Sequence, residues 1–315
     1  MFGELSKLLD RNFVIGYFLP AVALLAGAWL IFYANCLVSP PGKLEDVNAL
    51  VDATLSLGVV WLVAVTLLAL NRPIIRFIEG YGAWNPLKIW AAVQKRRFKT
   101  VAPILHTQTQ IDEARAAGAQ EPKRKPDHSL QLRKAVQDFP DAERWLLPTR
   151  FGNRYRAIEV YSRVVYGLDA IPAWPRLHTL LPKSFRTELA QAEAQLSFAV
   201  NLLFASVSLF TLQTILFAAV PSTRTYWIIG AAILLASSVF AWLFYELALA
   251  SLTGLGEYVR SAFDLYRFDL ANGLHLKVPA SVDEERTMWT EVSRLLIYRS
   301  AAARKRLANF SKDSS

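Results

Sequence analysis

The chain is poor in cysteine, histidine and charged residues. Its single cysteine, Cys36, excludes an intrachain disulfide and a cysteine-based zinc finger. The four histidines are scattered along 315 residues without the spacing of metal ligands. Charged residues make up 19% of the chain, below the roughly 25% of soluble domains, whereas hydrophobic residues make up 53%. The composition therefore excludes an ordinary soluble enzyme, a disordered chain and a disulfide-rich secreted protein, and it favours a membrane protein.

The sequence also lacks the short motifs of common enzymes. It contains no GxxxxGK[ST] phosphate loop, no GxGxxG dinucleotide fingerprint, no HExxH zinc motif and no GxSxG nucleophile elbow. The acidic group formed by Asp138, Asp141 and Glu143 surrounds Pro140, which favours a loop or a helix cap over a catalytic site. We therefore expect no enzymatic activity, no catalytic residue, no metal and no cofactor.

Four long apolar stretches match the length of a membrane-spanning helix. Each has close to the 20 apolar residues that cross the hydrocarbon core of a bilayer. They are residues 13–33, 50–70, 196–220 and 226–249. A short PSTRT connection between the last two makes them an antiparallel pair. The prediction is an all-α protein with four transmembrane helices in two hairpins and a mostly helical cytoplasmic domain.

The distribution of positive charge predicts the orientation of these spans. Between the first two spans, residues 34–49 hold one basic residue, Lys43. The second span is followed by Arg72, Arg76, Lys88, Lys95, Arg96, Arg97 and Lys99. Because cytoplasmic loops carry the excess of Lys and Arg, we expect both termini and the middle segment in the cytoplasm of a bacterial inner-membrane protein.

The predicted domains follow from these spans. Residues 1–70 form the first hairpin, 71–195 a basic cytoplasmic domain, 196–249 the second hairpin, and 250–315 a helical tail that packs on 71–195. Within them, hydrophobic spacing predicts helices over 86–113, 129–145 and 157–165. Three prolines predict an irregular elbow over 166–182, and a capping box at Ser281 predicts a last helix that runs to Leu307.

The middle segment carries the excess charge of the chain. Residues 71–195 contain 21 Lys and Arg against 12 Asp and Glu, a net charge of +9 that equals the net charge of the whole chain. Arginines interleaved with aromatic rings suit phosphates and unpaired bases, and Phe151-Gly152-Asn153 permits a turn with positive φ. The candidate ligand residues are Lys95, Arg96, Arg97, Lys99, Arg150, Arg154, Tyr155, Arg156 and Arg163. The alternative is that membrane topology and anionic lipids alone require the charge.

The third span is unusually polar and is the candidate pore helix. Asn201, Ser208 and Thr211 fall near one helix face, and Glu246 lies near the cytoplasmic end of the fourth span. Polar groups in hydrocarbon face protein or water, so a ring of such helices in a homo-oligomer would line a conduit. The alternative is that these groups bond to neighbouring helices or to their own backbone.

The residues between Leu146 and Pro182 carry a resemblance to known proteins. The residues are Pro148-Thr149-Arg150, Gly152-Asn153, Arg156-Ala157, Tyr166-Gly167-Leu168-Asp169-Ala170 and Trp174-Pro175-Arg176-Leu177. This run resembles a segment of bacterial multi-pass membrane proteins of largely unassigned function. The overall layout also looks like the membrane effectors of the Hailong anti-phage defence system. That resemblance implies an oligomeric channel held closed by DNA oligomers from a partner nucleotidyltransferase, with Arg150, Arg154, Arg156 and residues 95–99 at the ligand surface.

Two functions are therefore expected from the sequence. The first is a homo-oligomeric channel, such as a tetramer, gated by a single-stranded oligonucleotide or nucleotide in the cytoplasm. The second is a non-conducting scaffold that recruits a partner protein or anionic lipid through its basic domain. The polar third span favours the first, and the basic domain is compatible with both.

Overall fold

The structure is a computed structural model, and it describes residues 10–35, 47–116, 128–219 and 224–311. These residues form helices without a strand, apart from one backbone bridge between Leu276 and Ser311, which confirms the all-α prediction. The α-helices are α2 (Arg11–Phe13), α3 (Leu19–Ala34), α4 (Val47–Glu79), α5 (Ala91–Ala116), α6 (His128–Asp138), α7 (Arg150–Tyr166), α8 (Ala170–Leu180), α9 (Lys183–Ala219), α10 (Arg224–Gly273), α11 (Val282–Tyr298) and α12 (Ala301–Leu307). The π-helix η2 is Val14–Phe18, and the 3-10 helices are η3 (Pro86–Trp90), η4 (Glu143–Trp145) and η5 (Ala308–Phe310).

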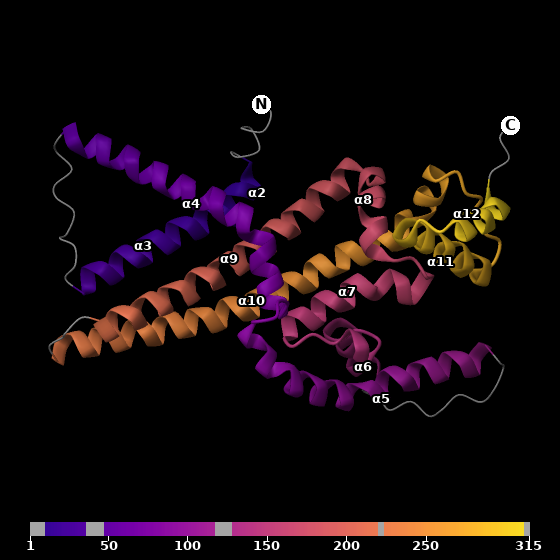
Figure 1. Cartoon of the computed structure of the whole chain (residues 1–315), viewed down its shortest axis with the longest axis horizontal. Helices are drawn as coiled ribbons and strands as arrows, with labels where there is room; N and C mark the ends of the chain where they lie inside the picture. Colours follow the sequence, from indigo (N-terminus) through magenta and orange to yellow (C-terminus); the bar gives the residue numbers. More distant parts are fainter. Residues whose placement is uncertain (1–9, 36–46, 117–127, 220–223, 312–315) are drawn as a thin grey trace. The chain divides into compact units, whose positions relative to one another are not determined.

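The chain divides into two compact units. Unit 1 consists of residues 1–76 and 190–251, and unit 2 consists of residues 77–189 and 252–315. Helices α4, α9 and α10 each supply residues to both units, because each boundary falls inside one of these helices (Figure 1).

Four helical stretches are long and apolar enough to cross a membrane. They are Arg11–Ala34, Thr54–Glu79, Lys183–Ala219 and Trp227–Gly273. Large apolar side chains along them are exposed in the single chain, for example Leu62 and Leu235 at 68% each. The last stretch would extend about 70 Å as a straight helix, more than twice the ~30 Å hydrocarbon core. Only part of α10 can therefore lie in hydrocarbon.

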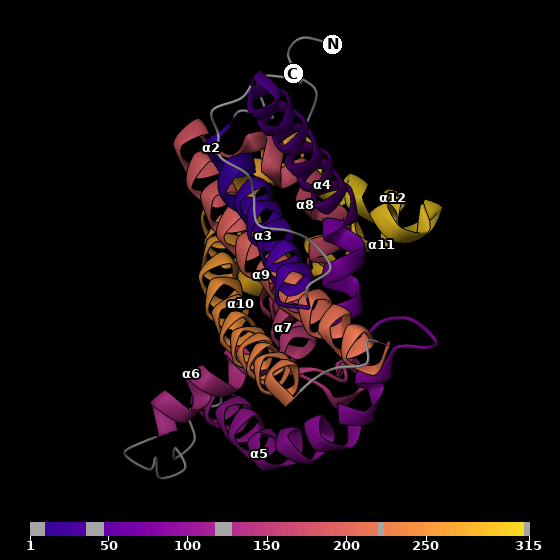
Figure 2. The ribbon, with the colours of Figure 1, turned by 90° about the vertical axis from the view of Figure 1, so that its left-hand side faces the viewer.

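Unit 1 is organised around the polar side of α9, which the views of Figures 1 and 2 place alongside the unit 1 part of α10. Ser197 accepts hydrogen bonds from Tyr17 at 3.2 Å and from Asn71 at 3.3 Å, which joins α9 to η2 and α4. At the other end of the unit, Gln213 accepts a bond from Asn35 at 3.2 Å. Interhelical hydrogen bonds of this kind hold helices together where lipid provides no hydrophobic drive.

Unit 2 buries its apolar side chains between short helices. Helix α6 packs on α5 and α7, while α11 packs on α7, α8 and α12. Phe151, Leu177, Trp289 and Phe263 are fully buried and mark this core. The polar capping residues that precede α7, α8, α11 and α12 explain why each helix begins where it does, since each side chain satisfies an orphan backbone N–H.

Two helix starts differ from the sequence prediction. Helix α7 begins at Arg150, because the Thr149 hydroxyl accepts a 2.9 Å hydrogen bond from the Gly152 N–H. The predicted positive-φ turn at residues 151–153 was therefore wrong. Gly152 is needed for space instead, since a Cβ atom there would lie 2.4 Å from the Glu79 carbonyl oxygen. The predicted elbow was also wrong, because Asp169 caps helix α8 within it.

The C-terminal helix is broken where the sequence predicted continuity. Ser281 caps α11 as expected and accepts a bond from the Glu284 N–H at 3.2 Å. However, Arg299 adopts a left-handed conformation with φ of 50°, which ends the helix. Ser300 then caps α12 by accepting a 3.2 Å bond from the Ala303 N–H.

Candidate anion-binding site

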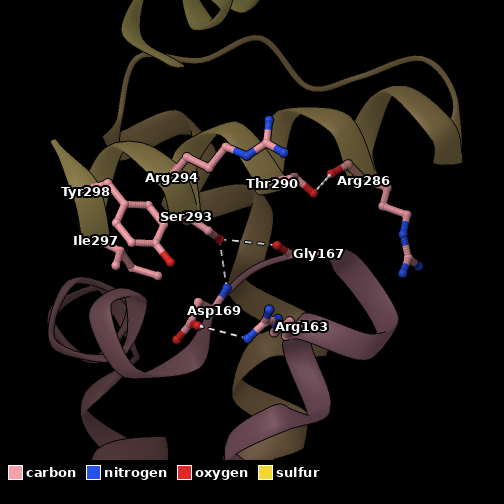
Figure 3. A pocket seen from close by; sticks show the side chains of 9 residues that line it. All are labelled: Arg163, Gly167, Asp169, Arg286, Thr290, Ser293, Arg294, Ile297 and Tyr298. Carbon is pink, nitrogen blue, oxygen red and sulfur yellow. Dashed lines mark hydrogen bonds and ion pairs between the residues drawn. The ribbon is translucent and has the colours of Figure 1, made fainter. Parts of the chain in front are cut away.

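A pocket in unit 2 brings three arginines to the turn between α7 and α8. It has a volume of about 410 Å³ and lies between that turn and one face of α11 (Figure 3). The lining residues are Arg163, Gly167, Asp169, Arg286, Thr290, Ser293, Arg294, Ile297 and Tyr298. Its size falls within the range of pockets that hold small-molecule ligands.

The floor of this pocket is a turn that is locked to α11. Gly167 ends α7 with φ of 84°, a conformation that L-residues with a side chain rarely adopt. A Cβ atom there would also lie 2.9 Å from the Arg286 carbonyl oxygen. The Ser293 hydroxyl accepts a 2.8 Å bond from the Asp169 N–H (Figure 3). Its own hydrogen is shared between the Trp289 carbonyl at 2.8 Å and the Gly167 carbonyl at 3.2 Å. The pocket is therefore built from backbone held in one geometry.

The charges at the pocket leave it positive. Arg163 faces Asp169 across 3.9 Å and is half exposed. Arg286 donates to the Val164 carbonyl at 3.1 Å, and Arg294 donates to Glu291 at 2.7 Å. A guanidinium group has five N–H donors, so each arginine keeps further donors beyond the interaction described above. Paired with the hydroxyl of a threonine at the same face, these groups match the oxygen atoms of a phosphate or carboxylate.

Arg294 can be replaced without leaving a buried carboxylate unpaired. Its partner, the buried Glu291, also forms a 3.0 Å ion pair with Arg306. Glu291 therefore keeps a cationic partner if the Arg294 side chain is removed.

The pocket turn is connected to α10 within unit 2. Tyr166, the last residue of α7, donates a 2.7 Å hydrogen bond to Asp264 of α10, and Tyr161 donates to the same carboxylate at 2.9 Å. Arg267 lies 4.4 Å from the centre of the Tyr166 ring and forms a 2.7 Å ion pair with Glu285 of α11. A change in the position of the turn would therefore be transmitted to α10 through Asp264.

Burial and the Asp264 carboxylate favour the neutral phenol form at this contact. Desolvation and then the hydrogen bond to Asp264 raise the pKa of Tyr161 to about 12 and raise the pKa of Tyr166 as well. An unfolded tyrosine titrates near pH 10. Because the folded pKa is the higher one, the stabilising contribution of the contact is complete below about pH 10 and is lost as pH rises through about 12.

An alkaline ultraviolet titration checks this expectation. The difference spectrum between the full-length protein and its Tyr161→Phe variant should show one phenol that ionises near pH 12 rather than pH 10. After unfolding in guanidinium, the same difference should return to about pH 10. A phenol that ionises near 10 in both states would contradict the Asp264 contact.

Two of the predicted ligand arginines are used inside the fold. Arg154 forms an ion pair with Asp138 and donates to Thr253 at 2.9 Å. Arg156 donates to the Tyr81 hydroxyl and forms a 3.0 Å ion pair with Glu159. These arginines hold the fold together in this structure, and a ligand would have to compete with those partners.

The aromatic rings among these arginines also have structural contacts. The Trp145 ring lies 5.4 Å from the Arg144 guanidinium carbon, 5.8 Å from that of Arg156 and 5.2 Å from that of Arg163. Such cation–π contacts occupy the ring face on which a base would stack. Half-buried Tyr155 lies with its ring centre 6.3 Å from that of buried Phe151.

The remaining predicted ligand residues lie apart from the pocket along the chain. Lys95 on α5 forms a 2.5 Å ion pair with Glu143, and this partner lowers the pKa of the Glu143 carboxyl. Arg96, Arg97 and Lys99 are exposed on the same helix. Arg150 is half-buried in the first turn of α7. Of the nine predicted ligand residues, Arg163 is the one that lines the pocket.

One predicted pore residue requires correction, and the others differ in exposure. Asn201 is fully buried, and its side-chain N–H donates to the Gly16 carbonyl at 2.8 Å, so it joins α9 to η2 rather than facing a conduit. Ser208 is half-buried and Thr211 is exposed, and both hydroxyls donate to their own backbone at 2.8 Å. Glu246 is half-buried.

Sequence reasoning missed most of the pocket residues, although a signal was present. Arg286, Thr290, Ser293, Arg294 and Ile297 follow an i, i+4, i+7, i+8, i+11 spacing. This spacing places them on one face of a helix. The spacing does not show which segment faces this side of α11. That segment is the α7–α8 turn, which lies more than 110 residues earlier in the chain.

The three arginines that line the pocket make it a candidate site for an anion. Among residues 10–35, 47–116, 128–219 and 224–311, no group of three His, Cys, Asp or Glu side chains is placed to hold a metal ion. No family model, curated protein or solved structure matches the chain, so its function is argued from the geometry of this site.

Proposed function

We propose that this protein is a homo-oligomeric inner-membrane channel gated by an anionic ligand that binds the arginine pocket in the cytoplasm. The observation that carries the proposal is the convergence of Arg163, Arg286 and Arg294 on one pocket. The ligand class is a nucleotide or a short single-stranded oligonucleotide, whose phosphate groups accept bidentate bonds from guanidinium groups. Four helices long and apolar enough to span a membrane support the channel part.

Gating would act through α10, one of the three helices that supply residues to both units. A phosphate bound by Arg286 and Arg294 would stabilise the arrangement in which α11 contacts the Gly167 turn, and Tyr166 links that turn to Asp264 of α10. Asp264 belongs to the stretch Trp227–Gly273 of this helix, which is long and apolar enough to include a membrane span. The ligand shifts the channel between two states by its difference in affinity for them and by nothing else.

A binding and conductance measurement on matched variants tests this proposal. The full-length protein is reconstituted in planar bilayers, and a short oligothymidylate or ATP is added to the cytoplasmic side. Arg294→Ala should weaken binding about tenfold, since a charge-assisted bond is worth ~1.5 kcal/mol. It should shift the concentration dependence of the conductance change by the same factor.

The control for this measurement is Arg304→Ala. It removes the same charge from an exposed position on α12, outside the pocket. Equal weakening by both variants would mean that the probes respond to net charge, and the pocket would no longer be the proposed site.

A non-conducting scaffold is the second candidate, and the packing of α9 favours it. Ser197, Asn201 and Gln213 each bond to another helix of the same unit, so these polar groups act as interhelical contacts. A scaffold predicts that anions bind the pocket with no conductance at any concentration. Current that appears or disappears with the probe would reject the scaffold.

A further inference from the structure

A set of large apolar side chains is exposed shortly after α4. Trp84 is 97% exposed, Ile89 is 75% exposed and Trp90 is 51% exposed, and Val93 follows on the first turn of α5. We call residues 84–97 the interfacial segment. Neighbouring apolar side chains with this exposure mark a surface that another phase or molecule covers.

The exposure of Trp84 comes from an ordered turn. The side-chain N–H groups of Asn85 donate to the Phe77 carbonyl at 2.7 Å and the Tyr81 carbonyl at 2.9 Å. Its side-chain oxygen accepts a 2.9 Å bond from the Leu87 N–H, and Asn85 itself is buried. Three hydrogen bonds to one buried side chain therefore fix the turn that points the indole outward.

The exposed face of the segment combines apolar and basic residues. Trp90, Val93 and Arg97 follow an i, i+3, i+7 spacing, whereas Gln94 and Phe98 on another face are buried in unit 2. Residues 80–111 contain five Lys and Arg and no Asp or Glu. Arg96 and Arg97 form no ion pair with any residue that the structure describes. A basic, aromatic-rich face of this kind is typical of segments that lie in a lipid headgroup layer.

The distance along the chain allows this segment to reach the membrane. The candidate span Thr54–Glu79 contains Arg76, and Trp84 follows eight residues later. Eight residues reach at most ~28 Å, and the turn shortens that reach. The segment is therefore tethered within reach of the bilayer surface. Because the tether keeps it close to the lipids, its effective concentration at the membrane is high, and a small apolar face is enough for binding.

We infer that the interfacial segment lies in the headgroup layer of the cytoplasmic leaflet, with Trp84, Ile89 and Trp90 inserted among lipids and Arg96 and Arg97 paired with anionic headgroups. The occupant of this surface is the anionic membrane itself. The inference needs a membrane-inserted chain but does not depend on channel activity or on the arginine pocket.

Site-specific fluorescence on the full-length protein tests the inference. In a Cys36→Ser background, an environment-sensitive probe is attached at Trp90→Cys or, as the matched control, at Lys99→Cys on the same helix. The protein is reconstituted in vesicles of phosphatidylcholine with one quarter phosphatidylglycerol. Lipids brominated in the acyl chain should quench the probe at 90 at least about twofold more than the probe at 99, since interfacial helices insert their apolar face by ~5–10 Å. Iodide in the cytoplasm-facing solution should show the opposite order.

The basic residues provide a second readout. Arg96→Gln with Arg97→Gln should increase iodide access to the probe at 90 in anionic vesicles and leave it unchanged in pure phosphatidylcholine, because the electrostatic part requires anionic lipid. Far-ultraviolet circular dichroism is the control, and it should give the same helix content for the variants as for the wild type. Equal iodide access at 90 and 99 without lipid quenching would overturn the inference. A probe at 90 that neither brominated lipid nor iodide quenches would also overturn it, because a protein contact would then cover this surface. Protection from iodide that appears only after an oligonucleotide is added would overturn it as well.

Discussion

Replacing Gly167 by alanine should destabilise unit 2 by about 3 kcal/mol and abolish binding at the arginine pocket. A left-handed conformation costs an alanine ~1–2 kcal/mol, and the added Cβ would lie 2.8 Å from the Thr290 hydroxyl oxygen and 2.9 Å from the Arg286 carbonyl oxygen. Overpacking of this kind adds ~1–3 kcal/mol. Chemical denaturation in detergent, followed by circular dichroism, measures the loss.

Gly254→Ala is the matched control for this substitution. Gly254 lies in the unit 2 part of α10, and a Cβ atom there meets nothing within 4 Å. Alanine in a helix is favoured over glycine by ~0.5–1 kcal/mol, so this variant should be unchanged or slightly more stable. If both variants kept the wild-type stability, the conformation assigned to the α7–α8 turn would be wrong.

Arg154→Ala should lower the free energy of unfolding by about 2 kcal/mol. Arg154 is paired with Asp138 and with Thr253, and its side chain is 15% exposed. Breaking a fully buried ion pair costs ~3–5 kcal/mol, and the 33% exposure of the Asp138 side chain reduces that cost through solvent screening. The loss should appear in denaturation experiments without any ligand, which separates a structural role from the ligand contact predicted from sequence.

A double-mutant cycle isolates this ion pair. The double variant Arg154→Ala with Asp138→Ala should lose less unfolding free energy than the sum of the losses in the two single variants. The reason is that Asp138→Ala removes a carboxylate that has already lost its partner. Arg133→Ala, on the exposed part of α6, removes an equal charge and should change stability by less than about 0.5 kcal/mol. Additive single effects would show that Arg154 and Asp138 do not interact, and a ligand role for Arg154 would regain support.

The sequence by itself determined the class of the protein and its local helix signals. The four apolar stretches need only their length and composition to be recognised, because the thickness of the bilayer sets both. The start of α11 at Ser281 was equally local, since a cap and the N–H that it satisfies lie three residues apart. The spacing of Arg286 and Arg294 on one face of α11 is local information of the same kind.

Only the tertiary structure decided which side chains meet. Arg154 and Arg163 lie on the same helix and look alike in the sequence, yet one is paired with Asp138 and the other lines a pocket. Asn201 resembled a pore residue until its bond to the Gly16 carbonyl placed it between helices. A side chain's partner depends on packing between segments far apart in the chain, and no local pattern encodes that packing. The candidate site arose in the same way, from an α7–α8 turn and an α11 face that only the fold brings together.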